Sequence, residues 1–240
     1  MRRTLSAALC GLGAFAACAA PVWVGRFEGG AAGWRDVSLS KSLTPTRYAL
    51  RDWDGVAAIE ATAERSMSLF ARPLALDLAA TPMLCWRWRV DAPLVGADLA
   101  TKAGDDYAAR VYVSFVLPPD RIDFATRLQL SVARKIWGDV VPDAALNYVW
   151  DNRYPVGTVR PNAYTDRTQM LVLQSGAQRA GAWVAERRDL AADVEAAFGA
   201  GARPSQLAVA SDTDNTGESA RAGFADFHFV ARDAACAFPT

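Results

Sequence analysis

The sequence predicts an all-β fold, a jelly-roll-type β-sandwich with one or two short helices. Short segments that alternate apolar and polar residues follow one another, separated by turn residues such as Asp52 to Gly55. Helical spacing is clear in only one stretch, residues 189–198, where Leu190, Val194 and Phe198 recur on one face. A length of 240 residues is sufficient for one large β domain with a buried core.

Each expected element is identified by its pattern and by the turn residues at its ends. The expected strands are, in order, Val22–Phe27, Val37–Leu39, Tyr48–Arg51, Val56–Thr62, Met67–Ala71, Leu84–Val90, Arg110–Leu117, Ala144–Asp151, Leu207–Ser211 and Phe224–Val230. Residues 124–136 fit either an amphipathic helix or another strand, and the pattern leaves both open. The stretch 189–198 is expected to form a short helix over one end of the sandwich.

The N-terminus is typical of an export signal. Arg2 and Arg3 precede an apolar stretch from Leu5 to Ala17, so residues 1–19 are predicted to be a signal peptide. The sequence Phe15-Ala16-Ala17-Cys18 resembles a lipobox, which would lipidate Cys18. Cleavage before Ala20 at a small-x-small site is the alternative. We expect a periplasmic protein, with a lipid-anchored outer-membrane form favoured slightly. Residues 20–240 are expected to be a single β-sandwich domain.

The charge balance argues against one class of partner, and the cysteines raise the question of a disulfide. Twenty-six basic and 26 acidic residues balance, and no long basic block occurs, which argues against a nucleic-acid partner. A lipid anchor is the only membrane contact that the sequence predicts. Export would allow a Cys85–Cys236 disulfide, but Cys85 could equally be a small buried residue in its strand. Spacing does not decide between them.

Alternation assigns two faces to two of the strands. One face carries apolar residues: Leu84, Trp86, Trp88 and Val90 in one strand, and Val111, Val113, Phe115 and Leu117 in the other. The opposite face carries Arg87 and Arg89 in the first strand, and Arg110, Tyr112 and Ser114 in the second. The apolar faces are predicted to line the core, and the polar faces are candidate ligand surfaces.

Aromatic and arginine side chains suggest a sugar-binding surface. Tyr112, Tyr148 and Trp150 could form a platform on which a flat sugar ring stacks. Arg87, Arg89 and Arg110, expected on the same sheet, would add planar hydrogen-bond donors for carboxylate or hydroxyl groups.

Carboxylates lie at the ends of two of the expected strands. Asp105 and Asp106 precede the Arg110 strand, and Asp212, Asp214 and Asn215 follow another. Two such carboxylates could act as acid and base in glycoside hydrolysis, with Asp106 and Asp212 as weak candidates. Capping of turns by aspartate is the commoner role.

The only histidine, His228, has no G-x-S-x-G motif before it. Ala225, Phe227 and Phe229 are expected to face inward, and Asp226 and His228 outward, which makes His228 a surface residue rather than a catalytic one. An enzyme is therefore the less favoured class.

Calcium is a further option for the segment after residue 211. Asp212, Asp214 and Thr216 reproduce the first half of an EF-hand loop, with Gly217 at the sharp turn. The position of the bidentate glutamate carries Gly223, so the second half fails. A calcium site completed by a distant strand and an Asx-rich turn that caps its own backbone both remain open.

Several motifs together are similar to one protein family. LCWRWRV, AGDDYAARVYVSFVLP, IWGDVVP, LNYVWDN, DVEAAFG and SDTDNTGESARAGFADFHF resemble a bacterial, typically exported family named domain of unknown function three-thousand-and-forty-seven. The resemblance covers nearly all of the chain after the signal and implies no activity. The F-E-G-x-x-x-x-W and F-x-D-F-x-F patterns also resemble carbohydrate-binding jelly rolls, at the level of the fold.

These observations predict an exported cell-envelope protein that acts as a non-catalytic binding module for a polar ligand, such as a glycan or an acidic small molecule. One alternative is an envelope carbohydrate hydrolase or lyase that uses Asp106, Asp212 or Asp214. Another is a structural envelope lipoprotein.

Overall fold

A computed structural model describes residues 20–38, 40, 42–137 and 141–239. The predicted signal peptide, with the lipidation candidate Cys18, lies outside the described residues.

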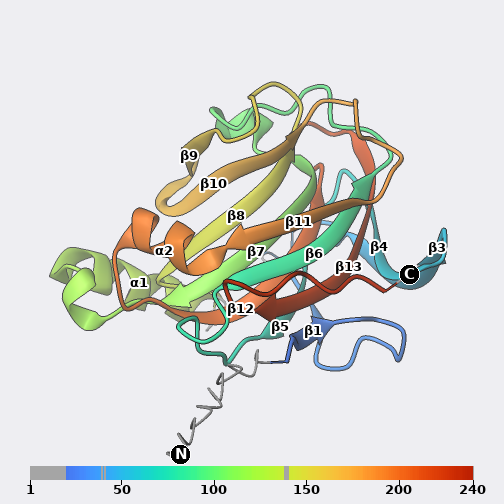
Figure 1. Ribbon diagram of the computed structural model, residues 1–240. Helices are drawn as coiled ribbons and strands as arrows, with labels where there is room; N and C mark the ends of the chain where they lie inside the picture. The colour runs from blue at the N-terminus through green and yellow to red at the C-terminus, as the bar shows by residue number, and fades with distance from the viewer. Residues whose placement is uncertain (1–19, 39, 41, 138–140, 240) are drawn as a thin grey trace, which may run out of the picture.

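Two sheets packed face to face form the molecule (Figure 1). The six-stranded sheet has the order β11-β6-β13-β4-β3, and β1 pairs with β13. Its strands are β1 (Val22–Gly25), β3 (Arg47–Trp53), β4 (Val56–Glu64), β6 (Met83–Val90), β11 (Val184–Asp189) and β13 (Ser219–Val230). The seven-stranded sheet has the order β2-β5-β12-β7-β8-β10-β9. Its strands are β2 (Arg35–Val37), β5 (Leu69–Pro73), β7 (Tyr107–Val116), β8 (Ala144–Asp151), β9 (Val159–Asn162), β10 (Thr165–Ser175) and β12 (Arg203–Asp212).

Two α-helices accompany the sheets in the described part of the chain, α1 (Phe124–Trp137) and α2 (Leu190–Phe198). The stretch 124–136, which the sequence pattern left open, is therefore helical. Asp123 caps α1 by accepting the backbone N–H of Thr126 at 2.9 Å. Asp189 caps α2, which lies at one end of the sandwich (Figure 1). Two short 3-10 turns, Lys102–Gly104 and Pro119–Arg121, flank β7. The predicted β-sandwich with two short helices is confirmed.

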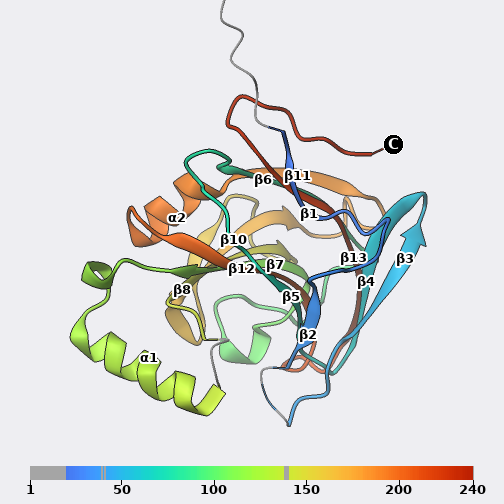
Figure 2. The ribbon, with the colours of Figure 1, turned by 90° about the horizontal axis from the view of Figure 1, so that it is seen from below.

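The core lies between the sheets and is rich in aromatic side chains. Trp86 and Trp88 of β6 pack edge to face with ring centroids 5.6 Å apart. Tyr148 and Trp150 of β8 meet them from the other sheet at 5.5 and 5.8 Å. The predicted apolar faces of β6 and β7 are confirmed, because all of their residues belong to this core. Figure 2 shows the two layers from below.

The C-terminal tail is fastened to the outside of the six-stranded sheet. Cys85 and Cys236 form a disulfide that closes a loop of 151 residues, which settles the alternative left open by spacing. A bulge at Asp226, with φ of 58°, interrupts β13. Alternation therefore shifts, and the expectation that Ala225 faces the main core is wrong: Ala225 packs on the outer side with Val56 and Ala58.

His228 does face outward, but Trp23 of β1 and the C-terminal tail together bury it completely. Its Nε2 accepts the backbone N–H of Ala237 at 2.9 Å, and its Nδ1 bonds the carbonyl of Asp226 at 2.6 Å. The expectation of a surface histidine is thus wrong, because residues after β13 fold back over it. In the described part of the chain, no helix has the length and apolar character needed to cross a membrane.

The buried His228 predicts a specific pH dependence of stability. Burial lowers the pKa of His228 below its ordinary value of 6.5, so the unfolded chain binds more protons in that range. The free energy of unfolding should therefore fall as the pH drops below about 6.5, when protonated Nε2 can no longer accept from Ala237. Thermal unfolding at pH 7.5 and 5.5 measures this loss. In His228→Gln the loss should be smaller, and an identical pH profile in both proteins would contradict the assignment.

Candidate functional site

The outer face of the seven-stranded sheet holds a polar cavity of about 350 Å³. Alternation along β7, β8, β10 and β12 turns polar side chains away from the core at neighbouring positions, and Tyr112 stands opposite Asn147 in the ladder. Loops at the end of β12 and at the β9–β10 turn complete the walls. The lining residues are Leu43, Met67, Asp105, Arg110, Tyr112, Asn147, Asn162, Tyr164, Thr165, Thr168, Asp212, Asp214 and Asn215.

A buried ion pair forms part of the cavity floor. Arg110 on β7 and Asp212 at the end of β12 lie 2.9 Å apart between Nη2 and Oδ2, and both side chains are more than nine-tenths buried. The backbone N–H of Tyr107 donates to the other carboxylate oxygen at 3.1 Å. Burial raises the pKa of Asp212, the Arg110 guanidinium opposes this, and the carboxylates of Asp106 and Asp105 reinforce it.

A second set of contacts holds the residues around the cavity entrance in place. Asp105 accepts from the Tyr107 hydroxyl at 3.0 Å and from Asn162 Nδ2 at 2.8 Å, which ties the end of β9 to the start of β7. The Tyr164 hydroxyl donates to Asn215 Oδ1 at 3.1 Å. Tyr164 is 56% exposed, so its ring stands at the cavity entrance.

Asn147 is the unusual residue of this site. It is 1% exposed, yet among the described residues neither its Nδ2 nor its Oδ1 has a hydrogen-bond partner. The Nε of Arg110 nearby is also buried without one in the described chain. Buried polar groups are nearly always paired, and leaving one unpaired costs about 1–3 kcal/mol. The cavity therefore presents a donor and an acceptor that remain free for a ligand.

A carboxylate from the segment before β7 holds the turn that follows β12. Asp106 accepts the backbone N–H of Thr216 at 2.6 Å and both the backbone and side-chain N–H groups of Asn215. Carboxylate oxygens of Asp106, Asp212 and Asp214 lie within 4.8 Å of one another, so these three could hold a hard cation. Thr216 is not in this group. A cation there would compete with Arg110 for Asp212. The turn is held mainly by Asp106, which comes from the segment before β7, whereas Asp212 bonds Arg110 and the N–H of Tyr107.

Four of the predicted ligand residues lie elsewhere. Arg87 and Arg89 belong to β6 in the other sheet, where they pair with Asp226 and Asp54, so placing them with Arg110 was wrong. The platform of Tyr112 with Tyr148 and Trp150 is also wrong.

Tyr148 and Trp150 are buried between the sheets, where their polar atoms bond Asp193 Oδ2 at 2.7 Å and the carbonyl of Gly176 at 3.0 Å. The reason is the alternation of β8, which turns Asn147 outward and both rings inward. The structure does bring together Asp105, Arg110, Tyr112, Asp212, Asp214 and Asn215, with Asp106 directly behind them.

Asn147, Asn162, Tyr164 and Thr168 were not predicted. Alternation within β8 puts Asn147 on the face opposite Tyr148 and Trp150, but its place beside Tyr112 depends on the pairing of β7 with β8. Asn162 and Tyr164 carry no comparable signal, because they reach the site only through the pairing of β9 with β10.

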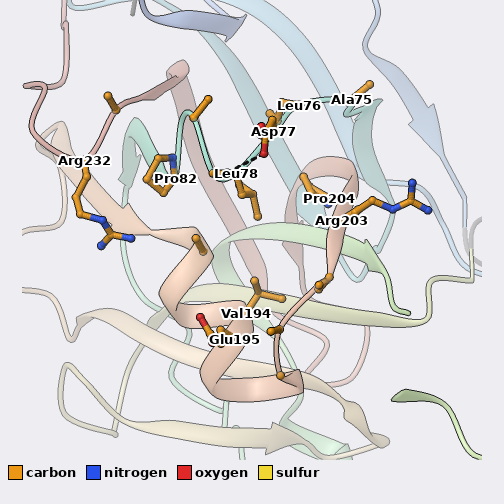
Figure 3. Close-up of a pocket in the computed structure, with 18 residues that line it drawn as sticks. Ala75, Leu76, Asp77, Leu78, Pro82, Val194, Glu195, Arg203, Pro204 and Arg232 are labelled. Atoms are coloured by element: carbon orange, nitrogen blue, oxygen red, sulfur yellow. Dashed lines mark hydrogen bonds between the residues drawn. The ribbon is translucent and has the colours of Figure 1, made fainter. Parts of the chain in front are cut away.

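A larger hollow of about 930 Å³ lies at the opposite end of β12, between α2 and the segment before β6. Figure 3 shows Leu78 and Val194 facing each other across it, with the guanidinium groups of Arg203 and Arg232 pointing outward. Its walls are mainly alanine, leucine and proline, and none of its described lining residues has a buried side-chain nitrogen or oxygen left unpaired. The chemistry therefore favours the smaller cavity as the functional site.

The chain belongs to a family described as "Protein of unknown function (DUF3047)", whose family model matches residues 32–228. No curated protein matches the chain. A crystal structure of a family 30 carbohydrate-binding module is similar with a TM-score of 0.41 and 11% identity, over 92% of this chain and 88% of that one. The family 30 carbohydrate-binding module of the cellulosomal cellulase CEL9D-CEL44B of Clostridium thermocellum gives 0.36 and 10%, over 90% and 95%. At these TM-scores the likeness assigns no ligand.

Removal of the buried guanidinium should destabilise the fold. Arg110→Ala leaves Asp212 buried without its counter-charge, and we expect a loss of about 3–5 kcal/mol in the free energy of unfolding. Urea titration measures the loss. Arg47→Ala is a matched control, because Arg47 pairs with Glu64 on the surface with both side chains largely exposed, and such a pair contributes less than about 1 kcal/mol. Equal losses in the two variants would refute a supporting role for the buried pair.

Proposed function

We propose that this chain is a non-catalytic binding module for a neutral, hydroxyl-rich ligand such as a glycan, held in the cavity on the seven-stranded sheet. The observation that carries the proposal is Asn147, whose amide is buried in the cavity lining and, in the described chain, unpaired at both polar atoms. A primary amide offers a donor and an acceptor side by side, which matches two neighbouring hydroxyl groups of a sugar.

The aromatic residues of the cavity support the same ligand class. Tyr112 lies beside Asn147 with its hydroxyl 3.3 Å from that of Thr168, and Tyr164 stands at the entrance. A ring face of this kind covers the apolar side of a sugar while the hydroxyls bond the polar groups.

The charge of the residues that line the cavity favours a neutral ligand over an acidic one. Asp105, Asp212 and Asp214 bring three carboxyl groups to the cavity against the one guanidinium of Arg110. This excess would repel an acidic ligand, so of the two partners that the sequence suggested we retain the neutral glycan.

The contacts of Asp106 and Asp212 fit a binding module better than a hydrolase. Asp106 is engaged by three N–H groups of the turn, and Asp212 by Arg110 and by the N–H of Tyr107. An acid or base of a hydrolase must reach the reacting bond with a free oxygen. These engaged oxygens hold the turn and the floor instead.

We also propose that the protein is exported to the periplasm and anchored through lipidated Cys18. The basic and apolar N-terminus supports export. The Cys85–Cys236 disulfide adds support, since such bonds persist in oxidising compartments and are rare in the reducing cytosol.

Asn147→Leu tests the ligand site. Leucine has nearly the shape of asparagine but offers no hydrogen bond, so affinity for a glycan retained by the wild type should fall at least about tenfold, the value of one lost hydrogen bond of 1.4 kcal/mol. The free energy of unfolding should not fall, because no described partner of Asn147 is lost. A panel of neutral and uronic-acid oligosaccharides, followed by calorimetry, measures the first quantity, and urea unfolding the second.

Asn152→Leu is the matched control. Asn152 follows β8 and is not among the lining residues of the cavity; its Nδ2 donates to the carbonyl of Val95. We expect this variant to bind like the wild type. Retention of no neutral glycan by the wild type, or unchanged affinity in Asn147→Leu, would refute the proposed site.

Cys18→Ala tests the proposed lipid anchor and cellular location. The lipid-anchored form should sediment with membranes, and the variant should appear in the soluble periplasmic fraction. Wild-type protein that is already soluble and begins at Ala20 would contradict lipidation while leaving export intact. Wild-type protein that stays in the cytosol would contradict both.

A further inference from the structure

Helix α1 exposes an apolar stripe on its outward side. Phe124, Leu128 and Val132 are 78%, 58% and 50% exposed. Residues four positions apart share one face of a helix, so the three side chains form a line about 12 Å long at 1.5 Å per residue. Figure 2 shows α1 standing out from the sandwich at one side.

The inward side of α1 is already occupied. Leu130 is buried in the core cluster, and Thr126, Gln129 and Ala133 line a cavity of about 270 Å³ between the helix and the seven-stranded sheet. The exposed stripe is therefore a second apolar face, on the opposite side from the one that packs.

Positive charge accompanies the stripe. The helix carries Arg127, Arg134 and Lys135 and no acidic residue, although the whole chain has equal numbers of basic and acidic residues. Arg134 pairs with Asp143 at 2.8 Å, whereas Arg127 and Lys135 are exposed. A helix with an apolar line and flanking basic residues has the features of one that lies in the interface of a membrane with anionic lipids.

We propose that α1 is a membrane-surface contact, with Phe124 and Leu128 entering the boundary between headgroups and acyl chains and Arg127 and Lys135 facing anionic headgroups. Charge complementarity selects this partner, because a purely apolar partner would not require the basic residues. This contact is separate from the glycan cavity and from any lipid at Cys18.

Vesicle flotation tests the contact with the chain from Ala20 onward, which contains every described strand and helix. Phosphatidylcholine vesicles containing phosphatidylglycerol should carry the protein upward, and vesicles of phosphatidylcholine alone should carry much less. Raising the salt from 0.05 to 0.5 M should release it, because the headgroup attraction is screened. Phe124→Ser combined with Leu128→Ser should weaken vesicle binding at least about tenfold.

Leu50→Ser is the matched control, since Leu50 on β3 is 52% exposed and lies away from α1. It should bind vesicles like the wild type. Circular dichroism and the melting temperature of the double variant establish that it is folded. Binding that survives the double substitution, or that is equal on both kinds of vesicle, overturns the proposal. So does a concentration-dependent dimer that the double substitution abolishes without any vesicle binding, because α1 would then face a second copy of the chain.

Discussion

The Arg110–Asp212 ion pair determines the geometry on which the site depends. It joins β7 to the last residue of β12, with both side chains buried, and fixes the point at which the polar turn leaves the sheet. Asp106 then holds that turn through Asn215 and Thr216. A buried pair of this kind gains little net stability over an apolar pair of the same volume, because removing two charges from water offsets their attraction. Its place under the cavity is better explained by the orientation that it gives to the floor.

Strand alternation then divides the seven-stranded sheet into a dry side and a polar side. On β8 it sends Tyr148 and Trp150 into the aromatic core and leaves Asn147 on the outside. Because Asn147 lies between Tyr112 on β7 and Met170 on β10, its amide is enclosed by neighbours that offer it no hydrogen bond. The same alternation thus fills the core with aromatic rings and leaves the polar Asn147 amide available to a ligand.

Local pattern was enough to predict the sandwich and the inward faces of β6 and β7, because alternation is a property of a single strand. Pattern could not reveal which strands share a sheet. Arg87 and Arg89 were predicted to share a sheet with Arg110, yet β6 pairs with β13 and β11 in the other sheet. The bulge at Asp226 and the tail over His228 are likewise set by contacts between distant segments. The outward position of Asn147, by contrast, follows from alternation within β8 alone, because Tyr148 and Trp150 lie on the opposite face.

Helix α1 lies near the proposed glycan cavity as well as carrying the proposed membrane contact. Its inward side lines the 270 Å³ cavity. This cavity shares Tyr112, Thr165 and Thr168 with the 350 Å³ cavity proposed for the glycan, so the two adjoin along the outer face of the seven-stranded sheet. Its outward side carries Phe124, Leu128 and Val132. A helix with its side chains is about 10–12 Å thick, so a membrane touching the outer side would lie about that distance from the 270 Å³ cavity, with the proposed glycan cavity adjoining it. A ligand bound there would then be held beside the lipid surface, and an envelope glycan is a hydroxyl-rich molecule that occurs at such a surface.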